Sequence, residues 1–145
     1  MSGTRLDHVG LAVGDLEAAA RWYGEALGYE VELELRVDAI DLDIVMLRHP
    51  AHGDRLELLS RPGSAPGPRH RNPAAAALVE GFGHVAFDVA DLDGTVARLV
   101  ALGARPVTAP GPSPEAGVRM AFLADPEGNL VELLSRDPVP FQEAP

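Results

Sequence analysis

The sequence contains no cysteine, no lysine and no long apolar run. Without cysteine, the chain has no disulfide framework and no thiolate metal site. The twelve basic residues are all arginine and face 22 acidic residues, and the formal net charge of −10 argues against a surface that binds the phosphate backbone of nucleic acid. No apolar stretch is long enough to cross a bilayer, and no basic start precedes an apolar segment. We therefore expect a cytoplasmic protein without membrane or nucleic-acid partners.

Two stretches of the sequence occur twice, in the same order. Residues 7–17 (DHVGLAVGDLE) return as residues 83–93 (GHVAFDVADLD), and residues 56–61 (LELLSR) return as residues 131–136 (VELLSR). An internal repeat of this kind indicates two related structural units. Each half is too short to bury a good core alone, so we expect the halves to pack on each other or on another chain.

The hydrophobic pattern predicts the same order of elements in each half, namely strand, helix and three further strands. In the first half we expect strands over 5–13, 29–37, 41–47 and 54–60 and a helix over 16–27. In the second half we expect strands over 82–89, 104–108, 117–124 and 130–135, a helix over 92–102 and a proline-rich loop over 109–116. Asp15 and Asp91 are predicted to cap the helices, and Gly28 and Gly103 to end them.

These patterns predict an α+β fold made of two βαβββ modules. We expect one domain over the 145 residues. It would comprise a first module at 5–61, a linker at 62–81, a second module at 82–136 and a tail at 137–145. The linker is assigned from its turn-forming residues, proline and glycine among them.

Each half carries a histidine in its first predicted strand and a glutamate in its last. His8 and His84 lie 76 positions apart, and Glu57 and Glu132 lie 75 apart. A single strand histidine is usually packed or at an edge, and a glutamate between leucines can simply face solvent. Repetition of the fold alone, however, gives little reason to keep an ionisable residue at both places. Imidazole nitrogens and carboxylate oxygens suit a divalent Zn, Ni, Co, Mn or Fe ion, so these four residues are candidate ligands of one such ion.

Three motifs resemble the vicinal oxygen chelate superfamily, which includes glyoxalase I, methylmalonyl-CoA epimerase, extradiol dioxygenases and bleomycin-resistance proteins. The motifs are residues 7–13 (DHVGLAV), 83–87 (GHVAF) and 125–133 (DPEGNLVEL). The resemblance covers residues 5–136 and implies paired βαβββ modules that form a curled mixed sheet around a metal cleft. The metal ligands that it implies are His8, Glu57, His84 and Glu132.

The implied ligand set is similar to that of glyoxalase I, whereas the epimerase typically has glutamine where this chain has Glu57. The resemblance thus implies a metal-dependent lyase or isomerase that moves a proton next to a carbonyl through an enediolate stabilised by the ion. Glu57 and Glu132 would each be ligand and catalytic base. The alternatives are an epimerase-like enzyme, a dioxygenase, and a non-catalytic protein that binds a small molecule in antibiotic resistance or in a biosynthetic pathway.

The substrate implied by this chemistry is a small molecule with two adjacent oxygens. The strand residues that could line its cleft are Met46, Phe87, Met120 and Phe122. In an epimerase-like enzyme a separate acid near the second or third strand would serve. Asp38 and Asp41 lie near that place, although a solvated strand end is the simpler explanation for each of them. Small members of the family are commonly homodimers, and we expect the same here.

Overall fold

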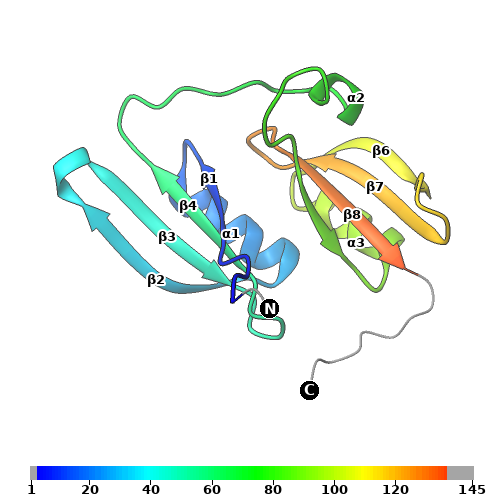
Figure 1. Cartoon of the computed structure of the whole chain (residues 1–145), viewed down its shortest axis with the longest axis horizontal. Coiled ribbons are helices and arrows are strands. Elements are labelled where there is room, and N and C mark those ends of the chain that lie inside the picture. Colours follow the sequence, from blue (N-terminus) through cyan, green and yellow to red (C-terminus); the bar gives the residue numbers. More distant parts are fainter. Residues whose placement is uncertain (1–2, 137–145) are drawn as a thin grey trace. The chain divides into compact units, whose positions relative to one another are not determined.

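The chain folds into two compact units, one up to Gly67 and one from Pro68, each with a four-stranded sheet and a helix (Figure 1). The computed structural model describes residues 3–136, so the predicted tail at 137–145 lies outside the described residues. The first unit contains β1 (Val9–Ala12), α1 (Leu16–Leu27), β2 (Glu30–Val37), the short 3₁₀ turn η1 (Asp38–Ile40), β3 (Leu42–Arg48) and β4 (Arg55–Ser60). The second contains α2 (Pro73–Ala76), β5 (Val85–Asp88), α3 (Leu92–Ala101), β6 (Arg105–Pro112), β7 (Val118–Ala124) and β8 (Leu130–Arg136).

The two sheets have the same topology. The strand order is β1-β4-β3-β2 in the first unit and β5-β8-β7-β6 in the second. In each sheet the first strand of the unit runs parallel to the last, and the other neighbours are antiparallel. The predicted α+β class and the two βαβββ modules are therefore confirmed.

The strand registers of the two units are also equivalent. Gly10 lies opposite Glu57 in the first sheet, and Ala86 lies opposite Glu132 in the second. Equivalent residues are 76 positions apart in β3 and β7 and 75 apart in β4 and β8, because the loop after β7 is one residue shorter than the loop after β3. A one-residue change inside a strand would turn its side chains to the opposite face. The shorter loop thus leaves both glutamates on the same face of their sheets.

Both longer helices begin where the sequence predicts, and α1 also ends there, whereas α3 ends one residue earlier than predicted, at Ala101. Asp15 accepts a hydrogen bond from the backbone N–H of Ala18 at 2.9 Å, and Asp91 accepts one from that of Gly94 at 3.0 Å. Gly28 ends α1 at φ 80°, in the left-handed region that favours glycine. In the described part of the chain, no helix has the length and apolar character needed to cross a membrane.

The helices α1 and α3 each pack against the sheet of their own unit (Figure 1). In the first unit α1 buries Trp22 and Tyr23, and Leu47 and Leu58 of the sheet are fully buried. In the second unit the fully buried residues are Leu99, Ala121, Val131 and Leu133. The opposite face of each sheet carries the repeated glutamate, so the core and the candidate ligands occupy different sides of the same strands.

The strands differ from the prediction at two kinds of place. The first strand of each unit is shorter than expected, and His8 and His84 lie immediately before β1 and β5. The predicted loop at 109–116 is wrong over its first part, because β6 continues to Pro112. This is an edge strand with register shifts around Thr108, and proline is tolerated at such places because its missing N–H need not complete a ladder.

Candidate metal centre

In the first unit, His8 and Glu57 are brought together by the parallel pairing of β1 with β4. Gly10 lies opposite Glu57, and His8 is two residues before Gly10 on the same face. The Nε2 atom of His8 lies 3.7 Å from Oε2 of Glu57. Because Gly10 has no side chain, the space beside this carboxylate stays open: a Cβ there would lie 3.6 Å from Oε1 of Glu57.

In the second unit, His84 and Glu132 form the equivalent pair. Nε2 of His84 lies 3.1 Å from Oε2 of Glu132. The His84 and Phe122 rings pack in a T-shaped arrangement, with ring centroids 5.2 Å apart and an interplanar angle of 82°. Phe122 lies opposite Glu132 in the ladder between β7 and β8, so it forms one wall beside this pair.

The geometry of each pair fits two neighbouring ligands of one divalent ion. Ligand atoms about 2.0–2.2 Å from a metal lie roughly 3.0–3.5 Å from each other in octahedral or tetrahedral coordination. The two nitrogen–oxygen separations, 3.1 and 3.7 Å, are close to that range. All four side chains are partly exposed, from 15% for Glu132 to 39% for His84. Within residues 3–136, no group of three or more His, Asp or Glu side chains is arranged to hold an ion.

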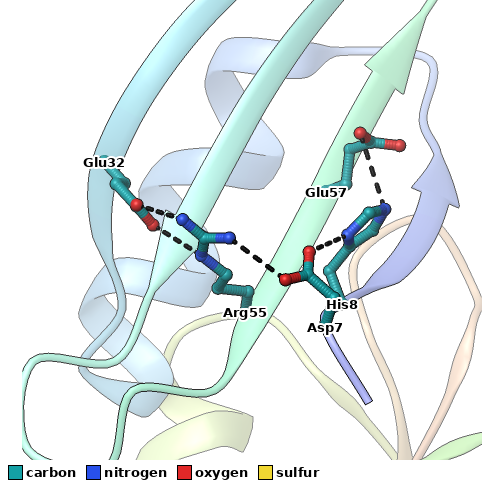
Figure 2. A network of polar contacts seen from close by, with 5 residues as sticks. All are labelled: Asp7, His8, Glu32, Arg55 and Glu57. Carbon is teal, nitrogen blue, oxygen red and sulfur yellow. Dashed lines mark hydrogen bonds and ion pairs between the residues drawn. The ribbon is translucent and has the colours of Figure 1, made fainter. Parts of the chain in front are cut away.

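His8 is also held from its other ring nitrogen (Figure 2). Nδ1 of His8 lies 2.7 Å from Oδ2 of Asp7. Nη1 of Arg55 lies 3.5 Å from the other oxygen of Asp7, and Arg55 also forms a two-nitrogen contact with Glu32. The hydrogen bond with His8, helped by the charge of Arg55, lowers the pKa of Asp7. The hydrogen bond from Arg55 likewise lowers the pKa of Glu32. This network of Glu32, Arg55 and Asp7 was not predicted from the sequence.

The residues predicted to line the cleft divide between the two faces of the sheets. Met46 lies opposite Glu57, and Phe122 lies opposite Glu132, so each shares a face with a candidate ligand. Met120 lies opposite Leu134, two residues from Glu132, and shares that face as well. Phe87 lies opposite Leu133 and is therefore on the other face, away from His84 and Glu132.

Asp38 and Asp41 lie at the tip of the β2–β3 hairpin, around η1. Both form ion pairs with Arg36, as does Asp43. The side chain of Asp38 is 90% exposed, and the side chain of Asp41 is 54% exposed. These contacts explain the two aspartates as parts of a solvated hairpin end.

The motif that begins at Asp125 forms the tight turn between β7 and β8. Asp125 is buried, and its carboxylate accepts hydrogen bonds from the backbone N–H groups of Glu127 and Asn129, at 3.0 and 2.9 Å. The Asn129 side chain also donates to it. The motif thus fixes the start of β8, and with it the position of Glu132 two residues into the strand.

Comparison with known proteins identifies the family. Residues 5–133 match the family described as Glyoxalase/Bleomycin resistance protein/Dioxygenase superfamily. An ethylmalonyl-CoA/methylmalonyl-CoA epimerase of Cereibacter sphaeroides is 34% identical over 89% of this chain and 96% of its own length. A probable lactoylglutathione lyase of Vibrio parahaemolyticus is 28% identical over 92% of both chains.

A solved structure agrees with this result. The trypanothione-dependent glyoxalase I of Leishmania major superposes with a TM-score of 0.69 and 28% identity, over 92% of this chain and 88% of that one. Similarity in sequence and in fold therefore extends over nearly the whole described chain. The chain belongs to the glyoxalase/bleomycin resistance protein/dioxygenase superfamily.

Proposed function

We propose that this protein is a metal-dependent lyase or isomerase of the glyoxalase type, which moves a proton on a carbon next to a carbonyl. The observation that carries this proposal is the His–Glu pair built twice, with 3.7 and 3.1 Å between the facing atoms. The proposed ligands of one divalent ion are His8, Glu57, His84 and Glu132. The ion would supply Lewis-acid chemistry at two adjacent oxygens of a small substrate.

The two carboxylates are proposed to transfer the proton. Glu57 and Glu132 are partly exposed, so a bound substrate can reach them, and each lies beside an apolar side chain of a neighbouring strand. A carboxylate in such a place can accept a proton from the carbon and return it to a neighbouring position. Met46 on the first sheet and Met120 and Phe122 on the second are proposed to contact the apolar part of the substrate.

The names of the relatives suggest two substrates to test. One relative is called a lactoylglutathione lyase, which favours the hemithioacetal of methylglyoxal and a thiol. The other is called an ethylmalonyl-CoA/methylmalonyl-CoA epimerase and is the more similar of the two, which favours an acyl-CoA with an acidic α-proton as the second candidate. The placement of Asp38 and Asp41 around Arg36 favours Glu57 or Glu132 as the base for either substrate.

The proposal is tested by metal content and turnover together. We expect about one divalent ion per chain by elemental analysis, and loss of that ion when His8→Ala is combined with Glu132→Ala. Glu57→Gln and Glu132→Gln should each lower turnover by about 100-fold or more, because a general base is removed. Glu115→Gln is the matched control, since Glu115 pairs with Arg136 and is not a proposed ligand.

The opposite results are equally informative. A wild-type protein that takes up no Zn, Ni, Co, Mn or Fe contradicts the proposed enzyme and favours a small-molecule binding protein. Full turnover by both glutamine variants contradicts the catalytic role of the carboxylates. Sedimentation of the same preparations tests the proposed homodimer.

A further inference from the structure

The two repeated histidines differ in what precedes them. His8 follows Asp7, whose carboxylate lies 2.7 Å from Nδ1 of His8. His84 follows Gly83, which has no side chain to offer at the equivalent position. The strand register around the two pairs is equivalent. One difference between the two units therefore lies at Nδ1 of the histidine.

The carboxylate of Asp7 is held in place by two further residues (Figure 2). Arg55 on β4 contacts Asp7 through Nη1 at 3.5 Å. Nε of Arg55 lies 2.9 Å from Oε2 of Glu32 on β2, and its Nη2 contacts the other oxygen of Glu32. Arg55 and Glu32 are less exposed than Asp7, at 28% each against 58%. Arg55 is thus fixed at one end by Glu32 and directs its other end at Asp7.

A carboxylate at Nδ1 has a defined effect on a neutral imidazole. The proton stays on Nδ1, where it is donated to the carboxylate, and Nε2 keeps the lone pair that a metal ion needs. In this structure Nε2 of His8 is the nitrogen that faces Glu57. A hydrogen bond of this kind selects the tautomer of an imidazole and fixes the direction of its ring.

We propose that Asp7, supported by Arg55 and Glu32, is a positioning residue that keeps His8 in the Nδ1–H tautomer with Nε2 ready to bind a metal. His84 lacks the matching side chain, so its tautomer is not selected in this way. The metal-binding part of this inference rests on the proposed function, whereas the tautomer part concerns the metal-free protein alone.

The first test is nitrogen-15 NMR of the metal-free protein. Spectra are recorded near pH 9, well above the ordinary imidazole pKa of about 6.5, so that the rings are neutral. His8→Gln and His84→Gln assign the signals. We expect His8 to carry its proton on Nδ1 in the wild type, and to shift toward the Nε2–H form in Asp7→Gly. The His84 signals are the internal reference and should not change. A wild-type His8 protonated on Nε2, or an unchanged tautomer in Asp7→Gly, would overturn the proposal.

The second test is metal affinity, measured by titration with Zn or Ni alone. Removing an outer hydrogen-bond partner of a ligating histidine typically lowers affinity about 10- to 100-fold, and we expect that loss for Asp7→Gly. Asp7→Asn should lie between, because its amide oxygen can still accept from Nδ1. Asp43→Asn is the matched control, since this half-exposed aspartate pairs with Arg36 away from His8.

The two proposals fail in different ways. A wild-type protein that binds neither metal contradicts the proposed function, and the tautomer of His8 still decides the role of Asp7. Metal binding with equal affinity in wild type and Asp7→Gly contradicts the positioning role alone. If Asp7→Gly does not fold, the wild-type spectrum together with Arg55→Gln supplies the same decision, because Arg55→Gln loosens Asp7 without removing it.

Discussion

Tyr29 shows how a single buried hydroxyl responds to its neighbours. Its side chain is 6% exposed, and its hydroxyl donates a hydrogen bond to the carboxylate of Asp54. The ring of His49 packs against it edge-on, with centroids 5.5 Å apart. Burial, together with the hydrogen bond to the Asp54 carboxylate, raises the pKa of Tyr29, since both disfavour the phenolate.

Tyr29→Phe tests this contact. We expect the free energy of unfolding at pH 7 to fall by about 1.5 kcal/mol, as for a hydrogen bond to a charged group. Because the pKa of Tyr29 is raised in the folded protein, its contribution is complete below the ordinary tyrosine pKa of about 10 and is lost as the pH rises above it. Urea unfolding at pH 7 and pH 11 checks this. A difference between the two proteins that stays constant across that range would contradict it.

The candidate ligands could be predicted because they occur twice, whereas their supporting residues could not. His8, Glu57, His84 and Glu132 stand out in the repeated sequence without any knowledge of the sheet. Arg55 and Glu32 meet across β3, and that contact depends on the register of three strands. The signal in the sequence for a residue supporting His8 was the difference between Asp7 and Gly83, the first residues of the two copies. Phe87 was named as a possible cleft residue and lies on the face opposite Glu132; its face also depends on register, since a one-residue step along a strand reverses the side-chain direction.

At the scale of elements, the helix ends were the most predictable feature. Asp15 and Asp91 are the residues whose side chains satisfy free N–H groups of the first turn, and that preference is local in sequence. The edge strand β6 was less predictable. Its prolines are typical of a loop, and the ladder to β7 that overrides them is a contact between separate segments.

Asp15→Ala and Asp91→Ala test the two caps as a matched pair. Each should lower the free energy of unfolding by about 0.5–2 kcal/mol, because one backbone donor loses its acceptor. Asp15→Asn and Asp91→Asn should restore most of the loss, since asparagine caps helices about as well. Denaturant melts of the four variants measure this. Equal stability of the alanine and wild-type proteins would show that the caps contribute nothing.

At the scale of the whole molecule, each half of the sequence builds a complete sheet. No strand of the first unit pairs with a strand of the second in the described chain, and α1 and α3 each pack on the sheet of their own unit. The same fold is thus reached twice from different side chains. What the repeat preserves is the alternation of side chains along each strand. This alternation keeps the core on one face of the sheet and the glutamate on the other.

Leu58→Ala and Leu133→Ala probe the two cores at equivalent depth. Both leucines are fully buried, and each lies one residue after the glutamate of its unit. Each change should cost about 2–5 kcal/mol, through lost burial and the cavity that remains. Unfolding by urea measures the cost, and hydrogen exchange shows whether the backbone amides around the altered side chain lose protection. A cost below about 1 kcal/mol at either site would contradict its place in the core.

The absence of strand pairing between the two sheets of the described chain has a practical consequence for synthesis. The segment at 61–72 contains no helix and no strand, so a chain could be joined there from two separately made pieces without interrupting a ladder. One piece could then carry the heavy isotope while the other did not. With a junction before His70, the signals of His8 would be recorded beside those of His49 and His52 only, and the signals of His84 beside those of His70 only, in an otherwise native sequence.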